Sequence, residues 1–131
     1  RHDIRVRGFC VRRNAETQKT RVLRCAQAVS EMLGLDDLVG PDDVEVSDDQ
    51  LGLGYGRPSE GSEEAIRMAA RLEGLLVDPV YTGKALAGMI ALARSGSIDG
   101  RPAAFIHTGG TPALFAYGPL DDPQGGPESS A

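Results

Sequence analysis

Apolar residues recur at two spacings in the first part of the chain, and each spacing predicts a different element. Residues 4–11, IRVRGFCV, alternate apolar and polar side chains on either side of Gly8, which indicates a strand with a bulge at the glycine. Residues 16–33 place apolar side chains three or four positions apart, so we expect a helix with one apolar face that ends at Gly34. That face comprises Val22, Ala26, Val29 and Leu33.

The next part of the chain is acidic at first and rich in glycine afterwards. A short VEV triplet within residues 35–50 predicts a second strand between two loops. LGLGYGRPSEG, residues 51–61, has four glycines and a proline, which predicts an irregular loop of the kind that often carries binding residues. Ser62 is expected to cap the following helix, which runs to about residue 76.

The sequence DPVYTGK, residues 78–84, leads into a third helix. Asp78 suits the capping position and Pro79 suits the first helical residue, so the helix begins either at Pro79 or near Thr82. AAFIH, residues 103–107, is a short apolar run between turns, which predicts a buried parallel strand. TGGTP follows it, and ALFAY then predicts a short final helix.

Strands that alternate with helices indicate an α/β fold with a mostly parallel sheet. We expect residues 1–117 to form one domain and residues 118–131, rich in Pro, Gly, Ser and Asp, to form a disordered tail. Two or three strands are few for a complete sheet, and the chain opens on a strand without an initiating Met. These features predict that the chain is a piece of something larger.

The composition narrows the class of protein. With 131 residues, 40% hydrophobic and 25% charged, the chain fits one soluble globular domain. A formal net charge of -5 does not suggest a nucleic-acid partner, and a solvated strand face explains the arginines near the N-terminus. No apolar stretch approaches the roughly 18 residues of a membrane-spanning helix. The two cysteines lack metal-ligand spacing, and a reducing, cytoplasmic location is expected.

Three stretches carry residues that suit a ligand site. Tyr55 projects from GYG, whose glycines let the backbone approach a ligand closely; the alternative is that this tyrosine covers a helix end. Tyr81 and Thr82 lie near a helix N-terminus, where free N–H groups face an anion or a polar ring; the alternative is a simple cap. HTGG follows an apolar run, where ligands of open α/β sheets gather, and His107 is there either a catalytic base or a structural histidine.

Together these stretches resemble a known family. EGLLVDPVYTGKALAGMI followed by FIHTGGTPALFAY is similar to the C-terminal part of the D-cysteine desulfhydrase and 1-aminocyclopropane-1-carboxylate deaminase family. The resemblance extends over roughly residues 4–117 and includes GYGRPSEGSEEAI. It implies an enzyme of the tryptophan synthase β-subunit fold (fold type II) that uses pyridoxal 5'-phosphate (PLP). It also implies a small amino-acid substrate and a possible homodimer in the full-length enzyme.

The resemblance implies roles for six residues. Tyr55 and Tyr81 correspond to the tyrosines on the substrate side of the cofactor, and Tyr81 is expected to relay a proton near the leaving group or the substrate carbon. Thr108 is expected to face the pyridine nitrogen of the cofactor. The residues expected to border the ring are Thr82, Gly109 and Gly110.

The residue at position 82 separates the activities within the family. The cyclopropane deaminases resemble one another in placing a Glu there, which holds the pyridine nitrogen protonated, whereas Thr82 stabilises the pyridinium much less. Because sulfur departs with its electrons, β-elimination needs less delocalisation than opening a cyclopropane. The prediction is therefore a lyase that converts D-cysteine to pyruvate, sulfide and ammonia. An L-cysteate sulfo-lyase, a 1-aminocyclopropane-1-carboxylate deaminase and a non-catalytic remnant of the fold are the alternatives.

The resemblance places the family's Schiff-base lysine in an N-terminal region outside these 131 residues. The chain has two lysines, Lys19 on the polar side of the first predicted helix and Lys84 in the third. We interpret Lys84 as a helix-surface charge or a charge that supports the site, not as the Schiff-base residue. The chain alone is therefore expected to be an inactive fragment of the enzyme.

Overall fold

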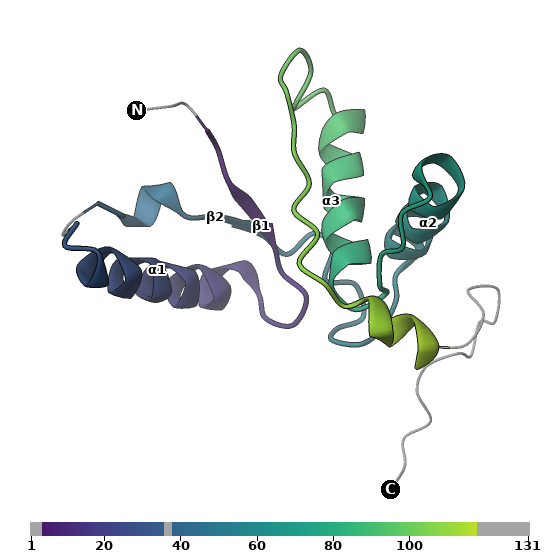
Figure 1. Ribbon diagram of the computed structural model, residues 1–131, viewed down its shortest axis with the longest axis horizontal. Helices are drawn as coiled ribbons and strands as arrows, with labels where there is room; N and C mark the ends of the chain where they lie inside the picture. The colour runs from purple at the N-terminus through teal and green to yellow at the C-terminus, as the bar shows by residue number, and fades with distance from the viewer. Residues whose placement is uncertain (1–3, 36–37, 118–131) are drawn as a thin grey trace, which may run out of the picture.

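Figure 1 shows the computed structural model, which describes residues 4–35 and 38–117. Its helices and strands follow in the order β1 (Arg7–Phe9), α1 (Ala15–Met32), β2 (Glu45–Ser47), α2 (Glu60–Met68) and α3 (Thr82–Arg94). Short turns of 3-10 helix lie at Pro41–Asp43 and Thr111–Phe115, and a π-helical turn, Ala69–Glu73, extends α2. This order confirms the predicted α/β class. The predicted disordered tail, residues 118–131, lies outside the described residues.

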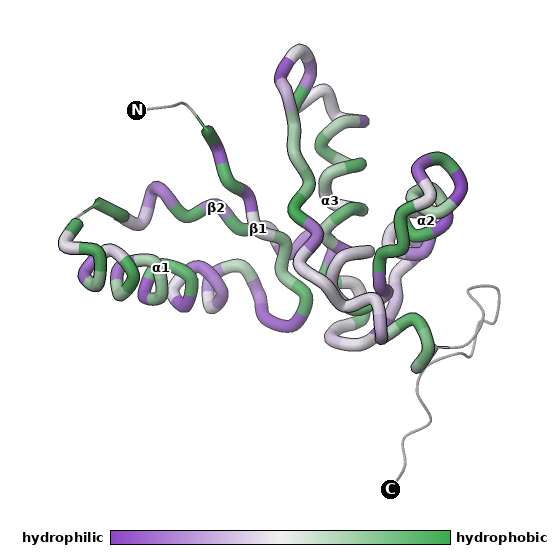
Figure 2. Tube along the Cα trace, viewed as in Figure 1, coloured by the Kyte–Doolittle hydropathy of each residue, from purple (hydrophilic) through white to green (hydrophobic). Residues whose placement is uncertain are grey.

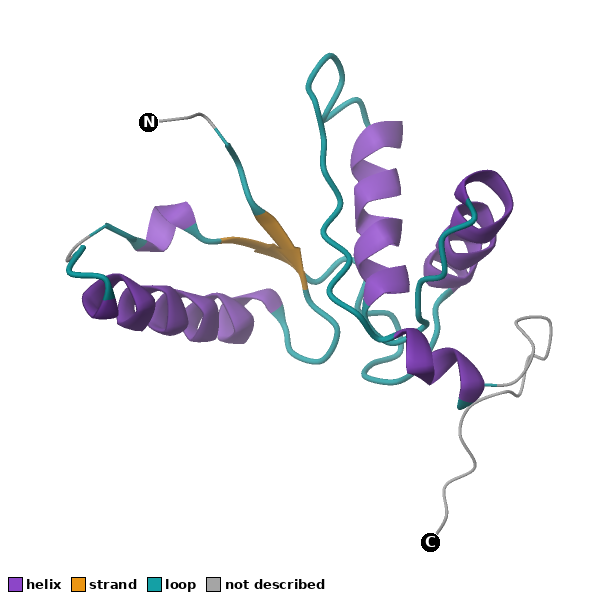
Figure 3. Cartoon of the chain, viewed as in Figure 1, coloured by secondary structure: helices purple, strands orange, loops and turns teal. Residues whose placement is uncertain are grey.

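The two strands form a parallel pair that α1 connects (Figure 3). The register places Arg7 opposite Glu45 and Phe9 opposite Ser47. The Glu45 carboxylate also binds the guanidinium groups of Arg5 and Arg7, which lowers the pKa of Glu45. The first strand is shorter than predicted, since its register with β2 covers only Arg7–Phe9, and it passes through Gly8 without the expected bulge. The parallel pairing itself was predicted correctly.

The predicted strand at residues 103–107 is wrong. The segment is drawn as a loop in Figure 3, and it is not part of the two-stranded sheet. Its residues are apolar (Figure 2), yet Ile106 is 74% exposed, and Phe105 packs only partly buried against Ile66 and Val77. A buried parallel strand needs strands beside it, and the described part of the chain offers none here.

The first helix, α1, agrees closely with its prediction. Asn14 caps it by accepting the N–H of Thr17 at 3.0 Å, and Gly34 adopts a left-handed φ of 65° beyond its last turn. The helix packs against β2. Its predicted apolar face is nevertheless poorly covered, since Val29 is 50% and Leu33 is 67% exposed. Much of that face therefore meets solvent in this chain.

The second and third helices, α2 and α3, pack against each other around a small apolar cluster. Its buried members are Ile66, Ala69 and Val77. On the other side of α3, Gly88 receives the ring of Phe9 from β1, because a Cβ on Gly88 would come within 2.1 Å of that ring. This glycine thus allows α3 to approach the sheet.

The starts of α2 and α3 refine two predictions. The predicted cap of α2, Ser62, is wrong: Ser59 is the cap, and the buried Ser62 hydroxyl accepts the N–H of Ser59 in return. Two serines three residues apart form such a reciprocal box, and the first has the extended backbone that a cap requires. The third helix begins at Thr82, the second of the two predicted positions. Within residues 4–35 and 38–117, no helix is long and apolar enough to cross a membrane.

Candidate active site

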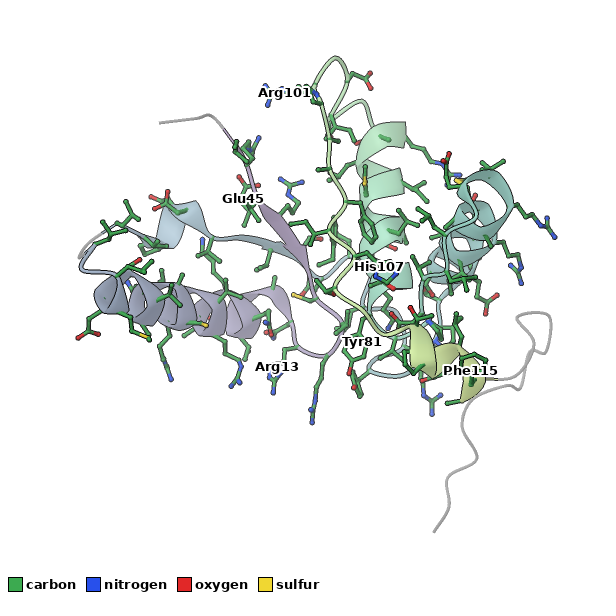
Figure 4. All side chains as sticks on the ribbon, viewed as in Figure 1. Arg13, Glu45, Tyr81, Arg101, His107 and Phe115 are labelled. Atoms are coloured by element: carbon green, nitrogen blue, oxygen red, sulfur yellow. The ribbon has the colours of Figure 1, made fainter. Side chains whose placement is uncertain are left out.

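The three candidate stretches of the sequence meet beside the start of α3. Tyr55 of the GYG loop contacts Tyr81, and Tyr117 donates its hydroxyl proton to the carbonyl oxygen of Gly56 at 2.7 Å, across 61 positions of sequence. Gly110 of the TGG turn lies against Asp78. Figure 4 shows Tyr81, His107 and Phe115 on these segments. Residues that are far apart in the sequence therefore form one candidate site.

The two tyrosines expected on the substrate side form a direct pair. Their hydroxyl groups are hydrogen bonded, and their rings meet edge to face with centroids 5.9 Å apart. Tyr55 is 48% and Tyr81 is 42% exposed, so the pair faces outward. The hydrogen bond with Tyr55 raises the pKa of Tyr81, while the Arg12 guanidinium, 5.4 Å from the centre of the Tyr55 ring, acts in the opposite direction. Tyr81 therefore keeps its proton at neutral pH and can donate it.

A buried carboxylate organises the backbone beneath this pair. Asp78 accepts the N–H groups of Val80, Tyr81 and Thr82, each at 2.8 Å, and the Thr82 hydroxyl at 2.6 Å. Burial alone would raise the pKa of Asp78, but these hydrogen bonds outweigh it and lower the pKa. The predicted capping position of Asp78 is wrong, because α3 begins at Thr82 with Tyr81 as its N-cap. The ionised carboxylate of Asp78 instead binds the N–H groups of the turn that leads into the helix and of Thr82.

The predicted ring neighbour Thr82 is buried, and its hydroxyl is already bonded. It donates to Asp78 and accepts the N–H of Asp78 at 2.9 Å, with only 2% of the residue exposed. A contact between Thr82 and the cofactor stays a prediction. The structure adds that this hydroxyl helps to hold the start of α3 in shape.

The TGG turn has an unusual backbone at both of its glycines. Gly109 and Gly110 have left-handed φ values of 105° and 93°. A Cβ on Gly110 would lie 2.4 Å from a carboxylate oxygen of Asp78, whereas Gly109 borders open space. Thr108 is exposed, and its hydroxyl has no partner in the described part of the chain. A flat ring can therefore approach the glycines and this free hydroxyl.

His107 has a structural environment. Its Nε2 is 2.9 Å from the carbonyl oxygen of Leu76, and its Nδ1 accepts the N–H of Gly109 at 3.2 Å. A carbonyl oxygen only accepts, so Nε2 carries the proton and both ring nitrogens are engaged. Of the two alternatives for His107, these bonds favour the structural one, in which the ring fixes the TGG turn.

Sequence reasoning left two alternatives for Lys84, of which the structure contradicts the first, and it missed Tyr117. Lys84 is not a helix-surface charge, because it is fully buried and its ammonium donates to the carbonyl oxygens of Leu51 and Gly54, both at 2.8 Å. Its spacing from the small residues Ala87 and Gly88 places it on the inner face of α3, a signal that was available in the sequence. Tyr117, which holds Gly56, had no such signal.

The residues present fit a PLP ring. The turn offers two glycines without a Cβ, the free Thr108 hydroxyl, and a pair of tyrosines on one edge. Thr108 could face the ring nitrogen, and the tyrosines could face the substrate. When bound, this cofactor supplies an electron sink for bonds at the substrate's α-carbon.

Comparisons with known proteins agree with this fit. A family model described as pyridoxal-phosphate dependent enzyme matches residues 2–109. A D-cysteine desulfhydrase of Salmonella paratyphi C (strain RKS4594) is 44% identical over 118 residues, which cover 89% of this chain and 35% of that protein. The D-cysteine desulfhydrase of Salmonella typhi is 43% identical over 118 residues, with the same coverage of both chains. A solved structure of an ACC deaminase homologue matches with a TM-score of 0.65 and 33% identity, over 76% of this chain and 29% of that one. The chain thus spans only 35% of the length of the curated relatives it matches.

Proposed function

The chain belongs to the family of pyridoxal-phosphate-dependent enzymes, and from that membership we propose that it is part of a lyase that eliminates sulfur from D-cysteine. Its fold is the tryptophan synthase β-like fold of such enzymes, as predicted. The proposed products are pyruvate, sulfide and ammonia. The observation that carries the proposal is the bonded pair of tyrosine hydroxyls beside the TGG turn.

The proposed roles follow from where the side chains lie. Tyr81 donates its proton to the departing sulfur or to the substrate carbon, since its raised pKa keeps it protonated. Tyr55 orients that hydroxyl through their hydrogen bond. Thr108 would bond the ring nitrogen of the cofactor, and Gly109 would let the ring approach the turn. Thr82 and Gly110 shape the floor of the site through Asp78.

A deaminase of 1-aminocyclopropane-1-carboxylate is the second candidate, because the ACC deaminase homologue shares the fold. The residue at position 82 argues against it. Thr82 carries no carboxylate for the ring nitrogen, and its hydroxyl is bonded to Asp78. Sulfur elimination, which needs the weaker electron sink, is the better match.

We propose further that the chain alone is inactive. Lys84 is buried with its ammonium bonded to two loop carbonyl groups, and Lys19 lies on α1, away from the tyrosine pair. Neither lysine is placed to bond covalently to a cofactor at the TGG turn. Sustained sulfide release from D-cysteine by the purified 131-residue chain with PLP would contradict this part of the proposal.

A hybrid enzyme tests the activity itself. In it, this chain replaces the matching 118 residues of the Salmonella paratyphi C desulfhydrase, which supplies the rest of the enzyme. We expect sulfide and pyruvate from D-cysteine. Sulfite from L-cysteate, or ammonia from 1-aminocyclopropane-1-carboxylate without sulfide from D-cysteine, would support an alternative activity instead. A folded hybrid that acts on none of these substrates would support a non-catalytic remnant.

In that hybrid, Tyr81→Phe should lower kcat for sulfide release by about a hundredfold, the usual contribution of a proton donor. Tyr55→Phe should lower it less, because Tyr81 keeps its own proton. Equal kcat values for Tyr81→Phe and the unsubstituted hybrid would rule out the proposed role of Tyr81.

The state of the cysteines fits the proposed cytoplasmic location. Cys10 and Cys25 are both free thiols, as a reducing compartment allows. Burial, with a smaller effect of Asp48, raises the pKa of Cys10 and keeps that thiol protonated and unreactive. A homodimer of the full-length enzyme stays a prediction.

A further inference from the structure

We infer that Lys84 is a positioning residue, which ties the loop that carries Tyr55 to the helix start that carries Tyr81. Its ammonium donates to the carbonyl oxygens of Leu51 and Gly54, both at 2.8 Å. The second of these belongs to the residue directly before Tyr55. The inference rests on the proposed role of the tyrosine pair. Lys84 keeps the two hydroxyl groups within hydrogen-bond distance of each other.

The surroundings of Lys84 destabilise its charged form, so a specific role is needed to explain a lysine at this position. The residue is fully buried, and this desolvation lowers the pKa of its amine. It is the third residue of α3, near the positive end of the helix dipole, where a cation is unfavourable. Both of its partners are neutral carbonyl oxygens. An apolar side chain of the same length would avoid these costs, so packing alone does not account for a lysine here.

The loop that Lys84 binds is held at its two ends by short hydrogen bonds, from the N–H of Leu51 to the carbonyl oxygen of Asp48 at 2.9 Å and from Tyr117 to Gly56 at 2.7 Å, but its middle is weakly held. Gly52, Gly54 and Gly56 all have left-handed backbone, with φ values of 60°, 121° and 72°. The loop's own backbone hydrogen bonds are long, at 3.3 Å from Gly54 to Leu51 and 3.4 Å from Arg57 to Gly54. Both carbonyl oxygens that accept these weak bonds also accept the ammonium of Lys84. The lysine therefore reinforces the turn at the points where it is weakest.

The position of Lys84 in α3 also allows it to link the segments that carry the two tyrosines. It lies three residues after Tyr81, so that one turn of chain presents both the Tyr81 hydroxyl and the ammonium to the loop. Tyr55 then reaches Tyr81 from the loop side. Without the ammonium, the loop keeps Tyr117 as a contact at Gly56 but loses its link to α3 next to Tyr55.

The test measures the tyrosine pair directly in the 131-residue chain. The chain has three tyrosines and no Trp, so isotope-labelled tyrosine gives three NMR signals that Tyr→Phe variants assign. Tyr55→Phe sets the reference, because it removes the hydrogen bond that raises the pKa of Tyr81. Lys84→Met should lower the pKa of Tyr81 towards that reference. Lys19→Met, the same change at the chain's other lysine, should leave it unchanged.

Folding is measured in the same samples. We expect Lys84→Met to keep the helical circular dichroism and most of the resistance to urea, since it removes a buried charge. Lys84→Gln, which keeps a donor on a shorter side chain, should lie between Lys84→Met and the unsubstituted chain. Unfolding of both variants, or a Tyr81 pKa unchanged by Lys84→Met while Tyr55→Phe lowers it, would overturn the positioning role.

Activity separates this inference from the proposed function. In the hybrid enzyme, Lys84→Met should lower kcat at least tenfold with little change in KM, and Lys84→Arg should restore part of the loss. If Lys84→Met shifts the pKa of Tyr81 but Tyr81→Phe keeps full activity, the positioning role stands and the catalytic proposal fails. If Tyr81→Phe is inactive but Lys84→Met changes neither the pKa of Tyr81 nor kcat, the catalytic proposal stands and the positioning role of Lys84 fails.

Discussion

At the start of α3, Asp78 is fully buried, and four hydrogen-bond donors converge on its carboxylate. Three of the donors are backbone N–H groups, those of Val80 and Tyr81 in the turn before α3 and that of its first residue, Thr82. The fourth, the Thr82 hydroxyl, is the shortest of these bonds at 2.6 Å. The carboxylate therefore stabilises the start of α3, and Gly110 of the TGG turn lies against it. This stabilisation requires the ionised form.

Asp78→Asn should therefore lower stability and change its dependence on pH. An amide keeps one acceptor oxygen but turns an N–H group towards backbone donors, which costs about 1–3 kcal/mol. The pKa of Asp78 is lowered in the folded chain, so its contribution is complete above the unfolded value of about 3.9 and is lost as the pH falls through the folded value. Urea unfolding at several pH values should show a flatter acid limb for Asp78→Asn.

Asp42→Asn is the matched control, since Asp42 is exposed on the turn at Pro41–Asp43. It should leave both the midpoint and the acid limb nearly unchanged. If Asp78→Asn keeps the full acid dependence of the unsubstituted chain, the carboxylate is not the source of that dependence.

The roles of single residues in the site could be predicted where they depend only on neighbours in the sequence. Asp78 was expected to cap a helix beginning at Pro79, and it does bind backbone N–H groups near the start of α3, but the N-cap itself is Tyr81. The three candidate stretches were identified by their glycines and hydroxyls, but their contacts depend on the loop and helix coming together in space. Lys84 was misjudged in part for the same reason, because a lysine is usually exposed unless the fold supplies buried partners. The roles of the tyrosines towards a substrate stay predictions.

At the scale of elements, the contact between β1 and α3 depends on one missing side chain. Gly88 lies in the middle of α3, where glycine costs about 1 kcal/mol relative to alanine. The ring of Phe9 occupies the place of its Cβ, with ring atoms at 2.1, 2.3 and 2.5 Å from that position. Glycine therefore lowers the helix propensity at position 88, but it allows α3 to pack on β1.

Gly88→Ala should for this reason destabilise the chain, although alanine favours helices. Displacing the Phe9 ring should cost about 1–3 kcal/mol, more than the gain in propensity. Phe9→Ala in the same chain should make Gly88→Ala neutral or favourable, which a double-mutant cycle in urea measures. Gly61→Ala in α2 is the control, because its nearest contact is the flexible end of Gln50 at 3.2 Å. A stabilising Gly88→Ala in the presence of Phe9 would contradict this packing.

The elements themselves show which signals in a sequence are reliable. α1 was predicted within about one residue at each end, because its cap and terminal glycine are local signals. The short strands formed where predicted and paired in parallel. The strand predicted at residues 103–107 failed, because its apolar composition suits burial between strands that this part of the fold does not supply. Local patterns predict helices well, whereas a buried strand depends on its neighbours.

At the scale of the whole molecule, many apolar side chains of the described residues remain exposed, and two groups of them stand out. One is a stripe on α1 that comprises Val22, Val29, Met32 and Leu33, and the other follows α2 and the TGG segment with Leu72, Leu75, Leu76, Ile106 and Phe115. Met32 is 86% and Phe115 is 91% exposed. Surfaces of this kind normally mark contacts with other protein. The relatives that this chain matches have further sequence, since the chain covers 35% of their length.

We therefore expect the isolated chain to associate at rising concentration and to bind an apolar fluorescent dye. Met32→Lys should reduce both effects, because it places a charge in the stripe on α1. The same change should leave the urea midpoint unchanged or slightly raised, since the side chain makes few contacts and a cation suits the end of a helix. Gln27→Lys adds the same charge at an exposed polar position of α1 and should reduce association less. Sedimentation velocity measures the association, and equal effects of the two substitutions would show that net charge, not the apolar stripe, controls it.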